Sequence, residues 1–360
     1  MLFQSSEKLL TSKHKSMIDP QLFLNPSKAF IHEIKNSIES EQDYHDSIPV
    51  SQTDLKKLAR GPRYFREAKL KREEEEEPYV DMNKYLKMGT MVEQKLLEPE
   101  RFEENFIEQA EMETPSSPNQ KEFVKLILSG EYGMVEAHDK AYANSNPSKA
   151  SKLYESLEQY INFQSESQGK GVYSQDEKET LLRVTGDIMS HNKASRLLLE
   201  DSVYENTWTQ LPLFAEINNV FVKGLIDRLV QINEDHFYLI DLKTTSKPLS
   251  NFGYHFLRRK YYIQLAMYTR LLTYHMRETY DINAKVKQIV IASHTQEPYD
   301  TVVRAVPFDL ISKGADAIED LTDRLKWHIN EEKWDRRKDY YDTNLHTLEY
   351  DSDNIPEMNL

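Results

Sequence analysis

The chain has 360 residues, a formal net charge of −14 and no cysteine. This length allows one large domain or two ordinary ones, with a sizeable hydrophobic core. The lack of cysteine excludes disulfides, thiolate zinc sites and iron–sulfur clusters, and it suits a reducing compartment. No apolar run reaches the roughly 18 residues that a membrane span needs, and the first residues do not form a signal peptide pattern. We therefore expect a soluble cytoplasmic protein without a membrane partner.

The charge is unevenly distributed along the chain. Acidic residues concentrate at 72–81 and in the tail from 336, whereas basic residues cluster at 54–72 and 258–260. A negative total disfavours a nucleic-acid partner, because phosphate binding needs Lys and Arg. The basic stripes nevertheless permit a DNA enzyme, since the local field steers a ligand. The solvated face of a helix is an equally good interpretation of each stripe.

The first third of the chain predicts helices. Residues 1–50 are polar and weakly periodic, and we expect helices or an extension of uncertain order there. A helix capped by Ser51 or Thr53 then ends before the Gly-Pro pair at 61–62. A second amphipathic helix lies within 80–98 and is stopped by the next proline.

The middle of the chain continues as helices until residue 200. Residues 118–200 are mostly helical in pattern, with breaks at Pro147 and in the polar stretch 163–179. Residues 201–245 are instead rich in aromatic and β-branched residues, with turn signals at 217–219 and 232–235. This pattern predicts three consecutive antiparallel strands.

The remaining elements complete an α/β fold. They are, in order, a helix at 261–276, strands at 285–296 and 300–308, and a helix at 309–333. This order predicts an α/β core with a large helical N-terminal region. The expected organisation is an N-terminal extension at 1–50, a single domain at 51–335 (helical at 51–200, sheet core at 201–335) and an acidic tail at 336–360.

A charged pair interrupts the last of the three consecutive strands. Asp241 and Lys243 lie two positions apart in "YLIDLKTT", and therefore share one face of the strand. Such a pair is either a salt bridge at the strand end or part of a site. The preceding strand carries Asp227 in an equally apolar context.

Two carboxylates on adjacent strands favour a metal site. A lone buried carboxylate is costly unless it is paired or binds a metal, so two of them are improbable as packing. Carboxylate oxygens suit Mg²⁺ or Mn²⁺, and a nearby lysine can orient or help to deprotonate a water molecule. The set matches what a divalent-metal phosphodiesterase needs.

In these residues the sequence resembles the PD-(D/E)xK nuclease superfamily. The motif is Asp227 followed by Asp241-Leu242-Lys243, and the resemblance is strongest to the RecB-like and phage-type exonucleases of the RecE (exonuclease VIII) group. Four further stretches are similar to that group in the same order: "VSQTDLKKLARGPRYF", "MGTMVEQKLLEPERF", "VYSQDEKETLLRVTGDIMSHNKASRLLLE" and "YYIQLAMY". The resemblance covers residues 51–275 and implies a mixed central sheet flanked by helices, as in restriction endonucleases.

The resemblance implies a metal site and its ligands. Glu93, Asp227, Asp241 and the Leu242 carbonyl would hold one or two Mg²⁺ or Mn²⁺ ions, and Lys243 would position the attacking water. Members of this group usually carry a His at the position of Glu93, so the metal preference of this chain is open. The other residues that the resemblance places near the metal or the DNA are Gln264, Tyr268, Glu216, Ser51, Thr53, Arg63 and Lys247.

Each supporting residue also has a structural interpretation. Gln264 and Tyr268 lie one turn apart on a helix and could be satisfied within the core. Glu216 fits equally well as an exposed strand residue, and helix capping is the more natural role for Ser51 and Thr53. Histidines 191, 236, 255 and 294 lack metal-ligand spacing, and we interpret them as structural or surface residues.

The expected function follows from the same resemblance. It implies a 5′→3′ exonuclease on linear double-stranded DNA that leaves 3′ single strands for recombination, repair or phage DNA metabolism. It further implies a homo-oligomeric ring, a single-strand annealing protein as partner, and the cytosol of a bacterium or of a phage-infected cell. The alternatives are a single-strand or flap nuclease of the RecB-like type, and a catalytically retired DNA-binding or structural protein on the same fold.

Overall fold

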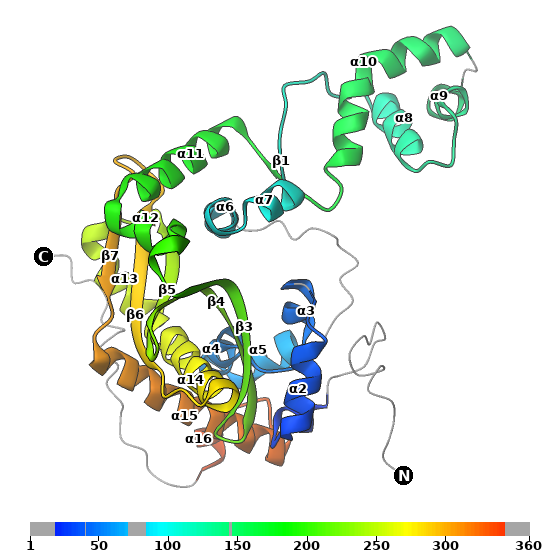
Figure 1. Cartoon of the computed structure of the whole chain (residues 1–360). Helices are drawn as coiled ribbons and strands as arrows, with labels where there is room; N and C mark the ends of the chain where they lie inside the picture. Colours follow the sequence, from blue (N-terminus) through cyan, green and yellow to red (C-terminus); the bar gives the residue numbers. More distant parts are fainter. Residues whose placement is uncertain (1–18, 40, 71–83, 144–145, 343–360) are drawn as a thin grey trace, which may run out of the picture. The chain divides into compact units, whose positions relative to one another are not determined.

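The computed structural model describes residues 19–39, 41–70, 84–143 and 146–342 (Figure 1). The acidic run at 73–77 and most of the predicted C-terminal tail lie outside these ranges. The chain divides into two compact units. We call residues 1–76 with 186–360 the sheet unit, and residues 77–185 the helical unit. Each unit is described by itself.

The sheet unit is built on a five-stranded mixed sheet with the order β3-β4-β5-β6-β7. Only the β5–β6 pair is parallel, and the other neighbours are antiparallel. The predicted α/β class and mixed sheet are confirmed. The strands are β3 (Asn206–Ile217), β4 (Val220–Asn233), β5 (His236–Thr245), β6 (Lys285–His294) and β7 (Thr301–Ala305).

Helices surround this sheet. A helical crossover joins the parallel strands β5 and β6, as such a pair requires. Along the chain the α-helices of the sheet unit are α2 (Lys28–Asn36), α3 (Glu41–Asp46), α4 (Gln52–Arg60), α5 (Pro62–Phe65), α12 (Asn192–Leu199), α13 (Phe252–Arg258), α14 (Tyr261–Tyr280), α15 (Phe308–Glu331) and α16 (Lys338–Tyr341).

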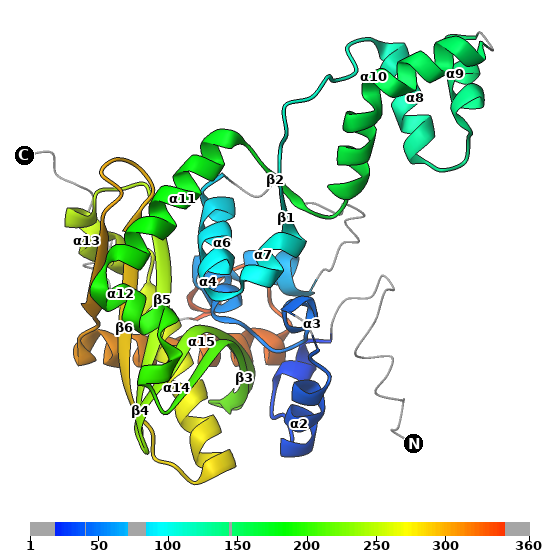
Figure 2. The same ribbon diagram turned by 45° about the horizontal axis from the view of Figure 1, so that its top comes forward.

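Helix α14 is held between the sheet and α15, as Figures 1 and 2 show. Two glycines allow this close packing. A Cβ on Gly224 of β4 would lie 2.6 Å from Leu271 Cδ1 and 2.8 Å from Tyr268 Cδ1. A Cβ on Gly314 of α15 would lie 2.5 Å from the Tyr262 carbonyl oxygen. Glycine at both positions therefore fixes how near α14 lies to β4 and to α15.

The segment before residue 51 contributes to the core of the sheet unit. Phe23, Ile48 and Val50 are buried in the same apolar cluster as strands β3 and β4. Val50 forms a parallel bridge with Val222, and its N–H donates to the Phe221 carbonyl at 2.9 Å. Residues 20–39 and 41–50 are thus part of the folded sheet unit.

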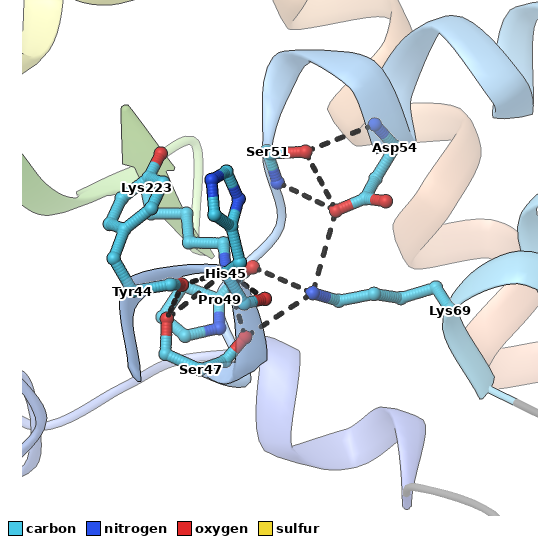
Figure 3. A network of polar contacts seen from close by, with 8 residues as sticks. All are labelled: Tyr44, His45, Ser47, Pro49, Ser51, Asp54, Lys69 and Lys223. Carbon is cyan, nitrogen blue, oxygen red and sulfur yellow. Dashed lines mark hydrogen bonds and ion pairs between the residues drawn. The ribbon is translucent and has the colours of Figure 1, made fainter. Parts of the chain in front are cut away.

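Two buried lysines, one on β4 and one at residue 69, hold this segment in place (Figure 3). The Lys223 ammonium of β4 donates to the carbonyls of Tyr44, His45 and Ser47. The Lys69 ammonium donates to the Pro49 carbonyl at 2.9 Å and pairs with a buried carboxylate of α4 at 3.4 Å. Because buried ammonium groups need such partners, the network holds residues 44–51 in place.

The helical unit contains a small parallel strand pair that the sequence does not predict. Strands β1 (Phe106–Glu108) and β2 (Gly171–Tyr173) pair within a region expected to be mostly helical. Three residues are too few to show an alternating pattern. The helices are α6 (Lys84–Leu97), α7 (Pro99–Asn105), α8 (Pro118–Leu128), α9 (Met134–Tyr142) and α10 (Pro147–Glu166), with α11 (Gln175–Ser190) beginning in this unit. Helices α8, α9 and α10 share an apolar core of their own.

In the part of the chain that the structure describes, no helix combines the length and the apolar character needed to cross a membrane.

The packing of α14 on α15 gives a stability prediction. Gly314→Ala places a methyl group against the Tyr262 backbone, and we expect the free energy of unfolding to fall by about 1–3 kcal/mol. The control is Gly186→Ala in α11, where the new Cβ would meet no atom within 4 Å apart from its chain neighbours and the backbone of its own helix. That change should be neutral or stabilise by roughly 0.5–1 kcal/mol. Urea unfolding followed by circular dichroism measures both, and equal stability of the two variants would contradict the packing described here.

Candidate active site

The site forms where strands β4 and β5 part. Their ladder runs from Asn233–His236 to Arg228–Ile240 and ends there. Beyond that point the Leu242 N–H donates to the Asp227 side chain, at 2.9 Å from Oδ2. A carboxylate therefore satisfies a backbone donor that a continuing ladder would have satisfied, while β5 stays paired with β6 as far as Thr245.

An irregularity in β3 lies opposite Asp227. The β3–β4 register runs from Thr209–Arg228 to Leu211–Ile226, and Gln210 and Asp227 between them are not a ladder pair. Gln210 has a positive φ of 48°, which is uncommon for a residue with a side chain. Local irregularities of this kind often re-aim a side chain beside a functional site.

Asp241 is the most buried member of the site, with 1% of its surface exposed. Its Oδ1 accepts hydrogen bonds from Lys243 Nζ at 2.6 Å and from Gln264 Nε2 at 3.1 Å. Gln264 Nε2 also donates to the Tyr268 hydroxyl at 3.2 Å. These hydrogen bonds join four of the predicted residues, two of them from α14, and the predicted Asp227 and Leu242 adjoin them on β4 and β5.

Lys243 is held in its charged form. Burial alone lowers the pKa of its ammonium, but the negative charges of Asp241 and Asp227 and the hydrogen bond to Asp241 outweigh burial. The net effect raises the pKa above its ordinary value. Lys243 thus offsets part of the negative charge that two neighbouring carboxylates bring into the sheet.

The second oxygen of Asp241 suits a metal ion. Asp241 Oδ2 is buried and has no hydrogen-bond partner among the described residues. Leaving such an oxygen unsatisfied costs free energy, whereas a bound cation would stabilise it. Asp227 and the Leu242 carbonyl are the neighbouring oxygen donors, and an all-oxygen set suits Mg²⁺ or Mn²⁺.

Glu93 lies on α6 in the helical unit, and its side chain is partly buried. Among the residues that the structure describes, no three His, Asp or Glu side chains are grouped to hold a metal ion. The role of Glu93 as a third carboxylate ligand stays a prediction.

Ser51 and Thr53 lie on either side of the start of α4. The Ser51 hydroxyl accepts from the Asp54 N–H at 3.2 Å, and the Asp54 carboxylate accepts from the Ser51 N–H at 2.9 Å. This reciprocal pair is a capping box, the structural role considered for Ser51. The Thr53 hydroxyl is exposed and accepts from Gln52 Nε2 at 2.9 Å.

The other three predicted contact residues are exposed. Glu216 is on β3, opposite Phe221. Arg63 pairs with Asp335 at 3.6 Å, and the Lys247 N–H donates to the Thr245 hydroxyl at 3.0 Å. Within the described ranges, no hydrogen bond or ion pair joins Glu216, Arg63 or Lys247 to Asp241 or Lys243.

Two residues near Lys243 are missing from the sequence-based prediction. Tyr261, the first residue of α14, has its ring centre 5.4 Å from Lys243 Nζ. Lys56 of α4 lies over the same ring at 5.5 Å. Lys56 stands in the basic stripe at 54–72, but nothing in the sequence distinguishes it from the other cations there. Only the fold brings residues 56 and 261 together.

A comparison with known protein families assigns the class of protein. A family model described as "PDDEXK-like domain of unknown function (DUF3799)" matches residues 51–343. The chain therefore belongs to this family of PDDEXK-like domains, and the predicted PD-(D/E)xK superfamily is confirmed. Family membership supports a nuclease.

Solved structures give weaker similarity. A crystal structure of a "Putative exonuclease" from Eubacterium rectale is 11% identical with a TM-score of 0.41, and the match covers 87% of this chain and 96% of that chain. A crystal structure of SSO0001 is 15% identical with a TM-score of 0.25, and the match covers 70% of this chain and 89% of that chain. No curated protein matches. Because both TM-scores are below 0.5, the family model alone carries the assignment.

The unpartnered oxygen of Asp241 gives a metal-binding prediction. We expect saturating Mg²⁺ or Mn²⁺ to raise the melting temperature, since a ligand at about 100 times its Kd stabilises by roughly 2.7 kcal/mol. Asp241→Asn should remove most of this metal-dependent increment. Asp201→Asn is the matched control, because Asp201 pairs with Arg228 rather than with the site. Differential scanning calorimetry with and without metal measures the increment.

The same titration tests Glu93. If Glu93 is a ligand, Glu93→Ala should shrink the metal-dependent increment, and Glu93→His should restore it more for Mn²⁺ than for Mg²⁺. An unchanged Mg²⁺ titration in Glu93→Ala would remove Glu93 from the ligand set. An unchanged increment in Asp241→Asn would instead remove the metal site from this part of the sheet.

Proposed function

We propose that this protein is a Mg²⁺- or Mn²⁺-dependent deoxyribonuclease. The observation that carries the proposal is the buried pair of Asp227 and Asp241 with Lys243, at the point where β4 and β5 part. Lys243 pairs with Asp241 through Oδ1 at 2.6 Å, which leaves Asp241 Oδ2 for another ligand. This oxygen is buried and has no hydrogen-bond partner among the described residues, and a cation site for phosphodiester hydrolysis would satisfy it.

The residues of the chain have distinct tasks in this reaction. Asp227, Asp241 and the Leu242 carbonyl would hold the cation, with Glu93 as the proposed third carboxylate. When bound, the cation supplies Lewis acidity to the phosphate and lowers the pKa of a water molecule. Gln264 fixes the carboxylate plane of Asp241 through its 3.1 Å hydrogen bond to Oδ1.

Lys243 is proposed to orient the attacking water and to stabilise negative charge on the phosphate. It is suited to both tasks because the negative charges of Asp241 and Asp227 and the hydrogen bond to Asp241 keep it protonated in spite of its burial. The side chain of Lys243 is 18% exposed, against 1% for Asp241. Removal of this charge would leave the two carboxylates to repel both each other and the phosphate.

Loss of any one of these three side chains should abolish cleavage. We expect Asp227→Asn, Asp241→Asn and Lys243→Ala each to lower the rate by orders of magnitude while the circular dichroism spectrum is kept, because residues that act as a unit fail together. Release of labelled nucleotides from DNA with Mg²⁺, Mn²⁺ or EDTA measures the rate. Asp201→Asn serves again as the control with native activity. Near-native turnover in any two of the three variants would make the site assignment wrong.

A more specific proposal is that the protein digests DNA from an end. We infer an exonuclease on linear duplex DNA that works 5′→3′ and leaves 3′ single strands, on the sequence resemblance to the RecE group. A ring of identical subunits and a strand-annealing partner belong to the same proposal.

Substrates with and without ends test this mode of action. We expect linear duplex to be degraded and covalently closed circular duplex of the same sequence to survive, since a closed circle offers no terminus to engage. Electrophoresis of both substrates over one time course gives the comparison. Equal cutting of both would assign the protein to the endonucleases. If only the linear duplex is degraded, 5′- and 3′-labelled linear duplexes distinguish the polarity of digestion.

A further inference from the structure

Two lysines from different parts of the fold lie over the ring of Tyr261. Lys243 Nζ of β5 is 5.4 Å from the ring centre, and Lys56 Nζ of α4 is 5.5 Å from it. Two like charges at one ring repel each other, so this arrangement costs free energy unless negative charge is also present.

Of these two lysines, only Lys243 forms an ion pair within the described part of the chain. Lys243 pairs with Asp241 at 2.6 Å. Within the part of the chain that the structure describes, no carboxylate lies at ion-pair distance from Lys56. The cationic neighbours of Lys56 include Arg259 and Lys260 as well as Lys243.

The electrostatic environment confirms that positive charge is crowded here. Burial, followed by the positive charges of Lys243, Arg259 and Lys260, lowers the pKa of Lys56 to about 8, although Asp241 acts in the opposite direction. A bound anion beside Lys56 would relieve both the desolvation and the repulsion. The geometry therefore calls for an anion at the Lys56 side of the Tyr261 ring.

We propose that Lys56 is a DNA-positioning residue that binds a backbone phosphate next to the one that is cut. The inference rests on the proposed nuclease function, which supplies the anion. Lys243 pairs with a carboxylate proposed to hold the cation at the scissile phosphate, and Lys56 lies over the same Tyr261 ring as Lys243. A strand bound at Asp241 would thus bring a neighbouring phosphate to Lys56.

The variants separate charge from packing. Lys56→Met removes the charge and keeps a long apolar side chain, and Lys56→Arg keeps the charge. The matched control is Lys313→Met, because Lys313 Nζ lies 5.5 Å from the ring centre of Tyr262, one residue further along α14. Melting temperatures of all variants show whether any change in DNA binding reflects loss of the fold.

Salt dependence of DNA binding is the decisive measurement. The probe is a short fluorescently labelled linear duplex, followed by anisotropy in EDTA over a series of NaCl concentrations. Loss of one phosphate contact should reduce the slope of log K against log salt by about 0.9 in Lys56→Met. Lys56→Arg and Lys313→Met should keep the wild-type slope. With metal present, Lys56→Met should raise KM for linear DNA roughly tenfold, more than it lowers kcat.

The outcomes distinguish this inference from the proposed function. If the wild type binds and cleaves DNA but Lys56→Met keeps its slope and KM, Lys56 does not contact phosphate and the inference is wrong while the nuclease stands. A similar loss of slope in Lys313→Met would also contradict it, because the effect would then follow total charge. If the wild type neither binds nor cleaves DNA, both proposals fail together.

Discussion

The hydrogen bond from the Leu242 N–H to Asp227 Oδ2 is the interaction on which the site depends. It stands at the end of the β4–β5 ladder, so a side chain replaces a backbone partner where the strands separate. A buried backbone donor must be satisfied, and a carboxylate that satisfies it is fixed in position. The same bond therefore ends the pairing, holds Asp227 and places the Asp241–Leu242–Lys243 segment beside it. The end of the β4–β5 ladder and the positions of Asp227, Asp241 and Lys243 therefore depend on each other.

Helix α14 connects the packing of the sheet unit to the Asp241–Leu242–Lys243 segment. Gly224 lets α14 approach β4 closely, and Gly314 lets α15 pack closely against α14. As a result Gln264 reaches Asp241 Oδ1, and its position is supported further by Tyr268. A polar amide in an apolar helix face is costly without such partners. Its burial is therefore compatible with the fold only because Asp241 and Tyr268 are there.

The sequence predicts the features that depend on local periodicity. Alternation along one strand is enough to place Asp241 and Lys243 on one face, and helical spacing is enough to align Gln264 with Tyr268. Contacts between distant segments are different in kind. The approach of Lys56 to Tyr261 depends on how α4 packs near the start of α14, and no local pattern encodes it. The sequence also gives no sign of where the β4–β5 ladder ends, because the residues before and after that point in each strand show the same strand pattern. Glu93 remains a prediction from resemblance alone.

The charge distribution explains how an acidic protein could work on a polyanion. The net charge of −14 repels DNA at long range, and salt screens that repulsion beyond about 10 Å. Close to the site the balance is reversed, because the positive charges of Lys243, Arg259 and Lys260 all act on Lys56. Binding would then rest on a few short-range phosphate contacts rather than on the field of the whole molecule. Under the proposed function, DNA would be held where these cations and the two carboxylates act on the same strand, and contacts elsewhere on the surface would add little.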